Sequence, residues 1–254
     1  MKSLLSSCAI AFSTYSRIPM PQVEWSEKNM RHTLALFPLV GAAVGLIFWA
    51  ADGICALLEA GPVLRAALLT AVPVAVTGGI HLDGYCDTVD ALSSHAGRER
   101  KLEILKDSSA GAFAVIWCAL WFLVYFGLLT ELDSARTAAA GFVLSRSLSA
   151  LAVERLPSAR SGMGATLKSG SSFPWWALGL YTAAYLAAVL LWGEPVPGLA
   201  ALAAAAACYF LYKRMALGVF GGFTGDLAGW FLTVCELVML AAVVAAERVV
   251  ALWF

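Results

Sequence analysis

Three aspartates between residues 83 and 90 are the side chains with the most evident chemical potential. Asp83, Asp87 and Asp90 are spaced by four and then three residues, so on a helix they fall within roughly 60° of one another. Like charges on one stripe repel each other, and more strongly near a low-dielectric boundary. A divalent cation removes this repulsion, and carboxylate oxygens are the ligands that Mg²⁺ uses beside substrate phosphates. The spacing therefore favours a magnesium site for a phosphate-bearing substrate over a solvated acidic face.

His81 lies just before this stripe. Its unperturbed pKa is near neutrality, so it could accept a proton from an attacking hydroxyl group. If the helix includes His81, its side chain points roughly 160° away from Asp83. Two roles are therefore open for it: catalytic base, or a residue that orients Asp83.

Two further pairs of polar residues have both structural and functional interpretations. Lys106 and Asp107 precede an apolar stretch, where a lysine can anchor at the membrane surface and an aspartate can cap a helix. Arg146 lies within an apolar stretch, where a charged side chain is costly and is usually paired or functional. Glu236 is its expected partner and supports the site, while Arg146 could also face substrate phosphates.

A glycine-rich turn, Gly221-Gly222-Phe223-Thr224-Gly225-Asp226, precedes the last apolar stretch. Backbone N–H groups of such a turn could bind phosphate, with Gly221, Gly222, Thr224 and Gly225 contributing and Asp226 as the N-cap. The turn could equally be a tight connection only. Arg160 belongs to a flexible basic loop that could cover an anionic substrate, although basic residues are also common on the inner side of membrane proteins.

The amino-acid composition indicates whether the chain is surrounded by water or by lipid. Of the 254 residues, 61% are hydrophobic and 13% are charged, whereas soluble domains have about 25% charged residues. The chain is therefore expected to be an integral membrane protein. Its formal net charge is zero, which gives no overall basic field for nucleic acid.

Seven apolar stretches approach the roughly 20 residues that a membrane-spanning helix needs. They are 33–58, 64–80, 110–130, 137–154, 174–192, 196–212 and 228–246. The sequence thus predicts an all-α, polytopic helix bundle of about seven spans, between six and eight, that forms a single membrane domain over residues 1–254.

The distribution of lysine and arginine predicts the orientation of these spans. With alternating sides, most of the 17 Lys and Arg residues fall on the side of the N-terminus, while the other side holds Arg65, Arg136 and Arg248. Cytoplasmic loops are enriched in both residues, so the N-terminus is expected in the cytoplasm. The longer connections, near 81–109, 155–173 and 213–227, lie on the same side, and the polar site is expected there.

Several motifs in one order resemble the cobalamin synthase family. The segment that begins at Gly78 and includes Asp83, Asp87 and Asp90 is the most distinctive. The other similar segments are Arg17-Ile18-Pro19, Phe37-Pro38-Leu39-Val40-Gly41, Leu102 to Ser108, Ser145-Arg146 and Gly221 to Asp226. The resemblance runs nearly end to end, and it favours an active-site role for Asp107.

This resemblance implies the activity of an adenosylcobinamide-GDP ribazoletransferase. Such an enzyme transfers the cobinamide-phosphate moiety of adenosylcobinamide-GDP to α-ribazole or α-ribazole 5′-phosphate and releases GMP. It implies Mg²⁺ on Asp83, Asp87 and Asp90, catalytic roles for Asp83 and Asp87, and residence in a prokaryotic cytoplasmic (inner) membrane in contact with lipid. Whether the chain forms a homo-oligomer is left open.

Two other functions are compatible with parts of this residue pattern. A prenyltransferase or CDP-alcohol phosphotransferase also presents Asp-rich helices at a membrane, but the spacing after Asp90 does not continue as the CDP-alcohol pattern requires. A transporter could use Asp83, Arg146 and Glu236 as a path. It should show polar residues through several spans, whereas here they gather at one side.

Overall fold

A computed structural model describes residues 2–107 and 109–253. These residues form helices and, apart from one isolated bridge between Ser158 and Phe223, no β-structure. In chain order the helices are α1 (Lys2–Tyr15), α2 (Glu27–Met30), α3 (Thr33–Leu57), α4 (Pro62–Thr77), α5 (Ile80–Ser93), α6 (Arg98–Ile104), α7 (Ala112–Glu131), α8 (Ala135–Arg155), α9 (Met163–Gly170), α10 (Trp175–Leu191), α11 (Pro195–Met215), the π-helical turn η1 (Ala216–Phe220) and α12 (Gly225–Trp253). The prediction of an all-α helix bundle is confirmed.

Helix α8 is the centre of the bundle. It contacts α3, α10, α11 and α12, and 14 of its 21 residues are buried. Because protein rather than lipid surrounds most of α8, it can carry serines and a charged residue that a lipid-facing helix would not tolerate.

Two glycines one turn apart bring α3 and α8 together. A Cβ atom at Gly41 would lie 2.2 Å from the carbonyl oxygen of Phe142, and one at Gly45 would lie 2.2 Å from that of Ala139. Small residues at this spacing let helix backbones approach closely inside a membrane. The two glycines therefore permit the close backbone contact of this helix pair, and the rings of Phe48 and Phe142 pack beside it.

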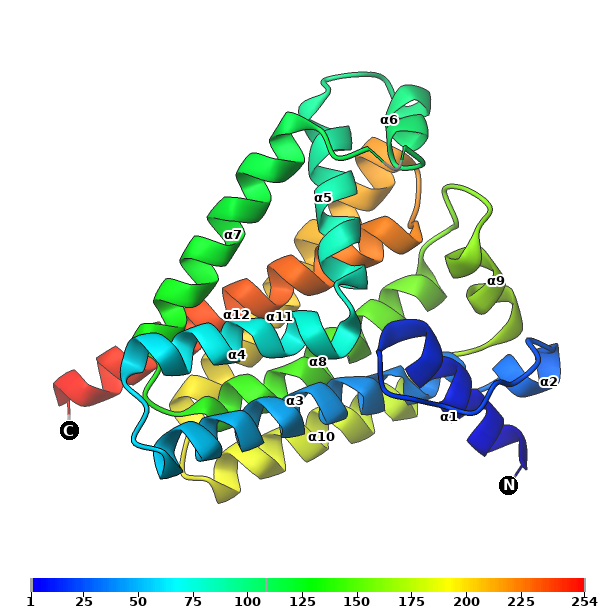
Figure 1. Cartoon of the computed structure of the whole chain (residues 1–254). Helices are drawn as coiled ribbons and strands as arrows, with labels where there is room; N and C mark the ends of the chain where they lie inside the picture. Colours follow the sequence, from blue (N-terminus) through cyan, green and yellow to red (C-terminus); the bar gives the residue numbers. More distant parts are fainter. Residues whose placement is uncertain (1, 108, 254) are drawn as a thin grey trace.

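A sharp turn separates the second apolar helix from the acidic stripe. Gly78 and Gly79 have φ angles of 67° and 79°, a conformation that glycine adopts without steric cost. Helix α4 ends before this pair and α5 begins after it at an angle of 91° to α4. The stripe thus lies on a separate helix that stands across the bundle (Figure 1).

The number of spans differs from the prediction of seven. Among the described residues, four segments are long and apolar enough to cross a membrane: α3, α7, α11 with η1, and α12. The number rises to six if the bent pairs α4–α5 and α9–α10 each count as one span. The expected span at 137–154 is α8, which carries Arg146 and Glu154. Multi-pass character is supported, but seven spans are not confirmed.

The connections that the sequence places on one side lie together in space. Helix α6 contacts η1, and α9 contacts α2, α3 and α8. In Figure 1, α1, α2 and α9 lie at the right of the molecule and α6 lies at its top, whereas the C-terminus lies at the left. This gathering of loops positions the candidate site.

Candidate active site

Helix α5 packs against the start of α12 through two glycines. A Cβ atom at Gly84 would lie 2.7 Å from the carbonyl oxygen of Asp226, and one at Gly229 would lie 3.0 Å from that of His81. The hydroxyl of Thr233 also donates a hydrogen bond to the His81 carbonyl oxygen at 3.1 Å. This close approach brings Asp226 next to the acidic stripe, although the two are far apart in the sequence.

The stripe and Asp226 form a cluster with excess negative charge. Asp83, Asp226 and Asp90 act on Asp87 by charge repulsion, and Arg160 acts on it by attraction. Arg160 itself donates to Asp226 at 2.5 Å. Among the described side chains, Asp83 and Asp87 have no ion-pair partner. They are the carboxylates left available for a cationic ligand.

Asp90 has a structural task in this arrangement. Its two oxygens accept hydrogen bonds from the backbone N–H groups of Gly111 at 2.6 Å and Ala114 at 2.9 Å. These groups begin α7 and lack acceptors within the helix. The Asp90 carboxylate therefore caps α7 from a neighbouring helix.

The three-carboxylate metal site expected from the stripe stays a prediction, and the arrangement of the described side chains gives it no direct support. Within residues 2–107 and 109–253, no group of three or more His, Cys, Asp or Glu side chains is arranged to hold a metal ion. The Asp90 carboxylate is engaged with the start of α7, which helical spacing alone does not reveal.

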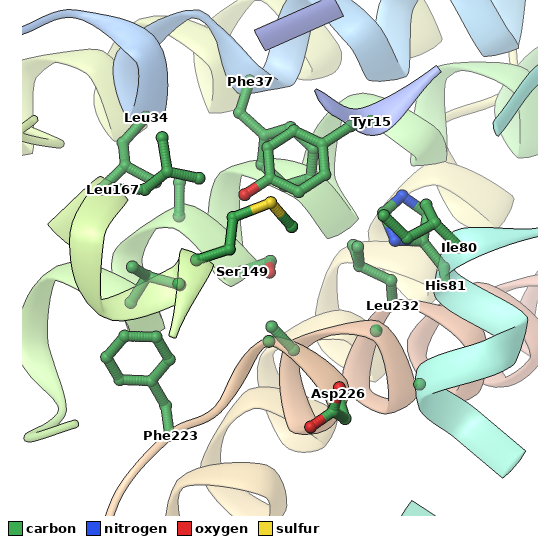
Figure 2. Close-up of a pocket in the computed structure, with 18 of the residues that line it drawn as sticks. Tyr15, Leu34, Phe37, Ile80, His81, Ser149, Leu167, Phe223, Asp226 and Leu232 are labelled. Atoms are coloured by element: carbon green, nitrogen blue, oxygen red, sulfur yellow. The ribbon is translucent and has the colours of Figure 1, made fainter. Parts of the chain in front are cut away.

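A largely apolar cavity of about 240 Å³ adjoins the cluster. Figure 2 shows Tyr15, Leu34 and Phe37 on one side of it and Asp226 on the other. The polar lining residues include His81, Asp83, Ser149 and Asp226. The cavity can therefore hold a flat apolar group with polar contacts at one edge.

A second cavity of about 590 Å³ lies on the other side of Asp83. It is lined by Ser13, Thr14, Ser16, Arg17, Thr77, Gly78, Gly79, Ile80, Leu82, Asp83, Cys86 and Cys118. Asp83 and Ile80 line both cavities. A reacting group beside Asp83 would thus be within reach of ligands in either one.

The glycine-rich turn divides into a structural half and a half that faces the site. Gly222 lies against the Pro157 carbonyl oxygen, where a Cβ atom would be 2.2 Å away, and Gly221 has a φ angle of 80°. Thr224, Gly225 and Asp226 line a further cavity of about 140 Å³ together with Arg160. Gly221 and Gly222 line none of the described cavities, so their observed role is to shape the connection.

Thr224 also defines where α12 begins. Its hydroxyl accepts a hydrogen bond from the N–H of Leu227 at 3.2 Å and donates one to the Asp226 carboxylate at 3.2 Å. Thr224 rather than Asp226 therefore provides the side-chain cap, and Asp226 is left to pair with Arg160.

His81 is 9% exposed and lies beside two aromatic rings that contact each other. Its ring centroid is 6.1 Å from that of Tyr15 and 6.3 Å from that of Phe37. The Nε2 atom is buried and has no hydrogen-bond partner. Since His81 also lines the 240 Å³ cavity, its ring is placed to meet a ligand there.

Arg146 and Glu236 form the expected ion pair between α8 and α12. Ser145 donates a hydrogen bond to the same Glu236 oxygen at 3.0 Å. Arg146 is fully buried and lines neither of the two cavities that meet at Asp83. The structural interpretation of this pair is therefore supported by its geometry.

Lys106 and Asp107 lie apart from these cavities, in the exposed connection before α7. Asp107 accepts a hydrogen bond from the N–H of Ser109 at 3.0 Å, and this bond lowers the pKa of its carboxyl group. The neighbouring Ser108 is outside the described residues. The observed role of Asp107 is local capping of the loop.

Several lining residues carry no chemical signal in the sequence. Tyr15, Ser149 and Arg17 come from different helices and connections, and they lie at the site only because the chain folds back on itself. For Arg17 and Phe37, membership of the short motifs noted in the sequence is the one available indication.

The helices define a polytopic membrane protein, and the cavities beside the acidic stripe are its candidate site. The model of the cobalamin-5-phosphate synthase family matches residues 7–244. The chain therefore belongs to this family.

Relatives of similar length share much of the sequence. A protein named adenosylcobinamide-GDP ribazoletransferase from Lachnoclostridium phytofermentans is 44% identical over 97% of this chain and 96% of its own length. Proteins of the same name from Desulfitobacterium hafniense and Clostridium botulinum are 34% and 30% identical, over 91% and 94% of this chain and 93% and 97% of their own lengths. No solved structure matches the chain.

Proposed function

We propose that the protein is an adenosylcobinamide-GDP ribazoletransferase that forms adenosylcobalamin, or its 5′-phosphate, and GMP. The observation that carries this proposal, beyond family membership, is the position of Asp83. This carboxylate has no ion-pair partner among the described side chains, and it lines both of the cavities of about 240 and 590 Å³. Both substrates of a transfer reaction could therefore reach it.

The reaction exchanges one phosphorus–oxygen bond for another. A ribose hydroxyl of α-ribazole attacks the phosphorus that bears the cobinamide arm, and the bond from this phosphorus to the bridging oxygen breaks. GMP leaves with the bridging oxygen, in line with the attacking group. His81 is the proposed acceptor of the hydroxyl proton, because its ring lines the cavity that suits the apolar base of α-ribazole.

The residues present fit Mg²⁺ as the cofactor with two carboxylate ligands. Asp83 and Asp87 supply hard oxygen donors in a cluster with excess negative charge, and Mg²⁺ commonly takes one or two carboxylates together with substrate phosphates and water. When bound, Mg²⁺ would neutralise charge on the diphosphate. Asp226 is held by Arg160 and Asp90 caps α7, so the proposed metal residues are reduced to Asp83 and Asp87.

The other residues expected to contact phosphate differ in whether they line a cavity. Arg160, Thr224, Gly225 and Asp226 line a cavity that adjoins the site. Arg146, Lys106, Asp107, Gly221 and Gly222 line none of the three larger cavities. Within the first group we favour Thr224 and Gly225 for contact with substrate, because Arg160 and Asp226 pair with each other. We assign the second group to support of the fold.

A GMP-release assay tests the function. Purified protein in neutral detergent, given adenosylcobinamide-GDP, α-ribazole and Mg²⁺, should release GMP, and Asp83→Asn should abolish release. Asp133→Asn is a matched control, because Asp133 lies at the other end of the bundle and contacts Arg248. A wild-type protein that is well folded but releases no GMP would contradict the proposal.

We propose a prokaryotic cytoplasmic membrane as the location, with the cavities facing the cytoplasm. The excess of Lys and Arg in the connections at the site end supports this orientation. Single cysteines introduced at Ser94 and Ser134 in a cysteine-free background should react with a membrane-impermeant reagent from opposite sides. Labelling of Ser94→Cys from the periplasmic side would contradict the orientation.

A further inference from the structure

Arg17 is the one lysine or arginine among the described residues that line the two cavities meeting at Asp83. It belongs to the connection that follows α1, and it lines the 590 Å³ cavity with Asp83. The other cations near the site are already engaged or lie elsewhere. Arg160 pairs with Asp226, and Arg146 pairs with Glu236.

The backbone of Arg17 is hydrogen-bonded to the end of α4, and its side chain lies against the turn between α4 and α5. Its N–H donates a hydrogen bond to the Val76 carbonyl oxygen at 2.8 Å. Its side chain lies across Gly78, where a Cβ atom would be 2.4 Å from the Arg17 Nε atom. Glycine at position 78 therefore serves two purposes: it permits the positive φ angle of the turn and it makes room for the arginine.

Arg17 has no carboxylate partner within the described ranges. A positioned guanidinium without a counter-ion is suited to a ligand that brings its own negative charge, and its planar donors match phosphate oxygens. Asp83, on the same cavity, would repel a bare anion. The ligand should therefore be a phosphate that arrives with a metal ion to occupy the Asp83 side.

Hydroxyl groups complete the polar wall of this cavity. Ser13 and Thr14 line it beside Arg17. The Ser13 hydroxyl donates to the Ile10 carbonyl oxygen at 3.2 Å, whereas the Thr14 hydroxyl is buried without a hydrogen-bond partner. A buried hydroxyl of this kind is stabilised when a ligand supplies an acceptor.

We infer that the 590 Å³ cavity binds the diphosphate of the nucleotide-bearing substrate and that Arg17 is its principal cationic contact. This inference rests on the proposed function and assigns that substrate to one side of Asp83. The apolar cavity on the other side is left for the acceptor. A bond from the acceptor to phosphorus would then form at the junction of the two cavities.

Steady-state kinetics of Arg17→Gln test the assignment in neutral detergent. The KM for adenosylcobinamide-GDP should rise about tenfold or more, the effect of losing one charge-assisted contact, while the KM for α-ribazole should stay within twofold. Arg17→Lys should give an intermediate value, because it keeps the charge and loses the planar fork. Arg31→Gln is the matched control, since Arg31 is exposed and lines none of the described cavities.

A binding measurement gives a readout that does not depend on turnover. Inorganic pyrophosphate with Mg²⁺ should bind the wild type by calorimetry and should bind Arg17→Gln about tenfold or more weakly. Equal pyrophosphate binding and an unchanged KM in Arg17→Gln, in an otherwise active protein, would overturn the inference while leaving the proposed function intact. An inactive wild type would instead count against the function itself.

The alternative source of a phosphate is a lipid headgroup. If Arg17 only anchors the chain to anionic lipid, Arg17→Gln should behave as wild type in neutral detergent and lose activity only in bilayers that contain phosphatidylglycerol. That pattern would overturn the inference. A raised KM in both environments supports it.

Discussion

The Arg146–Glu236 pair and the Asp83–Asp87 stripe show two ways of placing charge inside one helix bundle. In the first, a cation from α8 meets an anion from α12, and Ser145 adds a hydrogen bond. In the second, carboxylates from α5 lie near Asp226 and keep no cation of their own. A charge neutralised by its own fold stabilises the bundle, whereas a charge left without a partner is available to a ligand.

Breaking the buried pair should have the largest effect on stability. Arg146→Met leaves the Glu236 carboxylate buried without its cation, which typically costs about 3–5 kcal/mol. The melting temperature in detergent should fall accordingly. The double variant Arg146→Met/Glu236→Gln should recover part of this loss. A single variant as stable as wild type would show that the pair does not hold α8 to α12.

Widening the contact between α5 and α12 should have the next largest effect. In Gly84→Ala the new Cβ atom would be 2.7 Å from the Asp226 carbonyl oxygen, and such overpacking costs about 1–3 kcal/mol. The rate of GMP release should fall even under conditions in which the variant is still folded, because Asp226 would move away from the stripe. Gly127→Ala is a matched control, since a Cβ atom at Gly127 meets nothing within 4 Å. Full activity in Gly84→Ala would show that the site does not need this close approach.

Removing the Asp90 cap should cost less. Asp90→Ala leaves the N–H groups of Gly111 and Ala114 without their acceptor, and the loss of a helix cap typically costs about 0.5–2 kcal/mol. We expect a lower melting temperature and an unchanged response to Mg²⁺. If Mg²⁺ no longer raised the melting temperature of the folded variant, Asp90 would have to be counted among the metal ligands.

Neutralising one carboxylate of the stripe should change stability the least. Unlike the variants above, it should stabilise the protein. Asp87→Asn removes repulsion from Asp83 and Asp226, so the ligand-free protein should become more stable by a few tenths of a kcal/mol. The stabilisation that the wild type gains from added Mg²⁺ should shrink, and EDTA should no longer change the melting temperature. If Asp87→Asn were instead destabilised like Arg146→Met, the contrast between the two regions would fail.

Much of the fold and part of the candidate site could be predicted from the local pattern of residues in the sequence. The apolar stretches predict helices that are present, and the spacing of Asp83 and Asp87 places both on the helix that lines the cavities. Arg146 and Glu236 were expected partners because a charge deep in an apolar helix needs compensation, and the structure pairs them. Each of these predictions depends only on the residues of one helix and on whether its surroundings are apolar. The periodicity and hydropathy of the sequence indicate both.

Other features depended on contacts between distant segments. Asp90 lies on the acidic stripe by spacing, but its carboxylate is engaged by α7, whose start is separated from it by the whole of α6. The predicted span at 137–154 stays unconfirmed, because α8 is largely surrounded by protein and need not be apolar. Neither fact leaves a signal in the periodicity of the residues concerned.

The amino-acid sequence by itself determined a helical membrane protein of this family, with an acidic stripe preceded by two glycines that permit a sharp turn. Only the tertiary structure decided which carboxylates of the stripe lack a partner, that Asp226 lies near them paired with Arg160, and that Arg17 lies on the cavity beside Asp83. The physical reason is the separation along the chain of the residues that interact. Helix formation follows from neighbours a few residues apart, whereas neutralisation of a charge depends on whichever side chains the packed helices bring next to it.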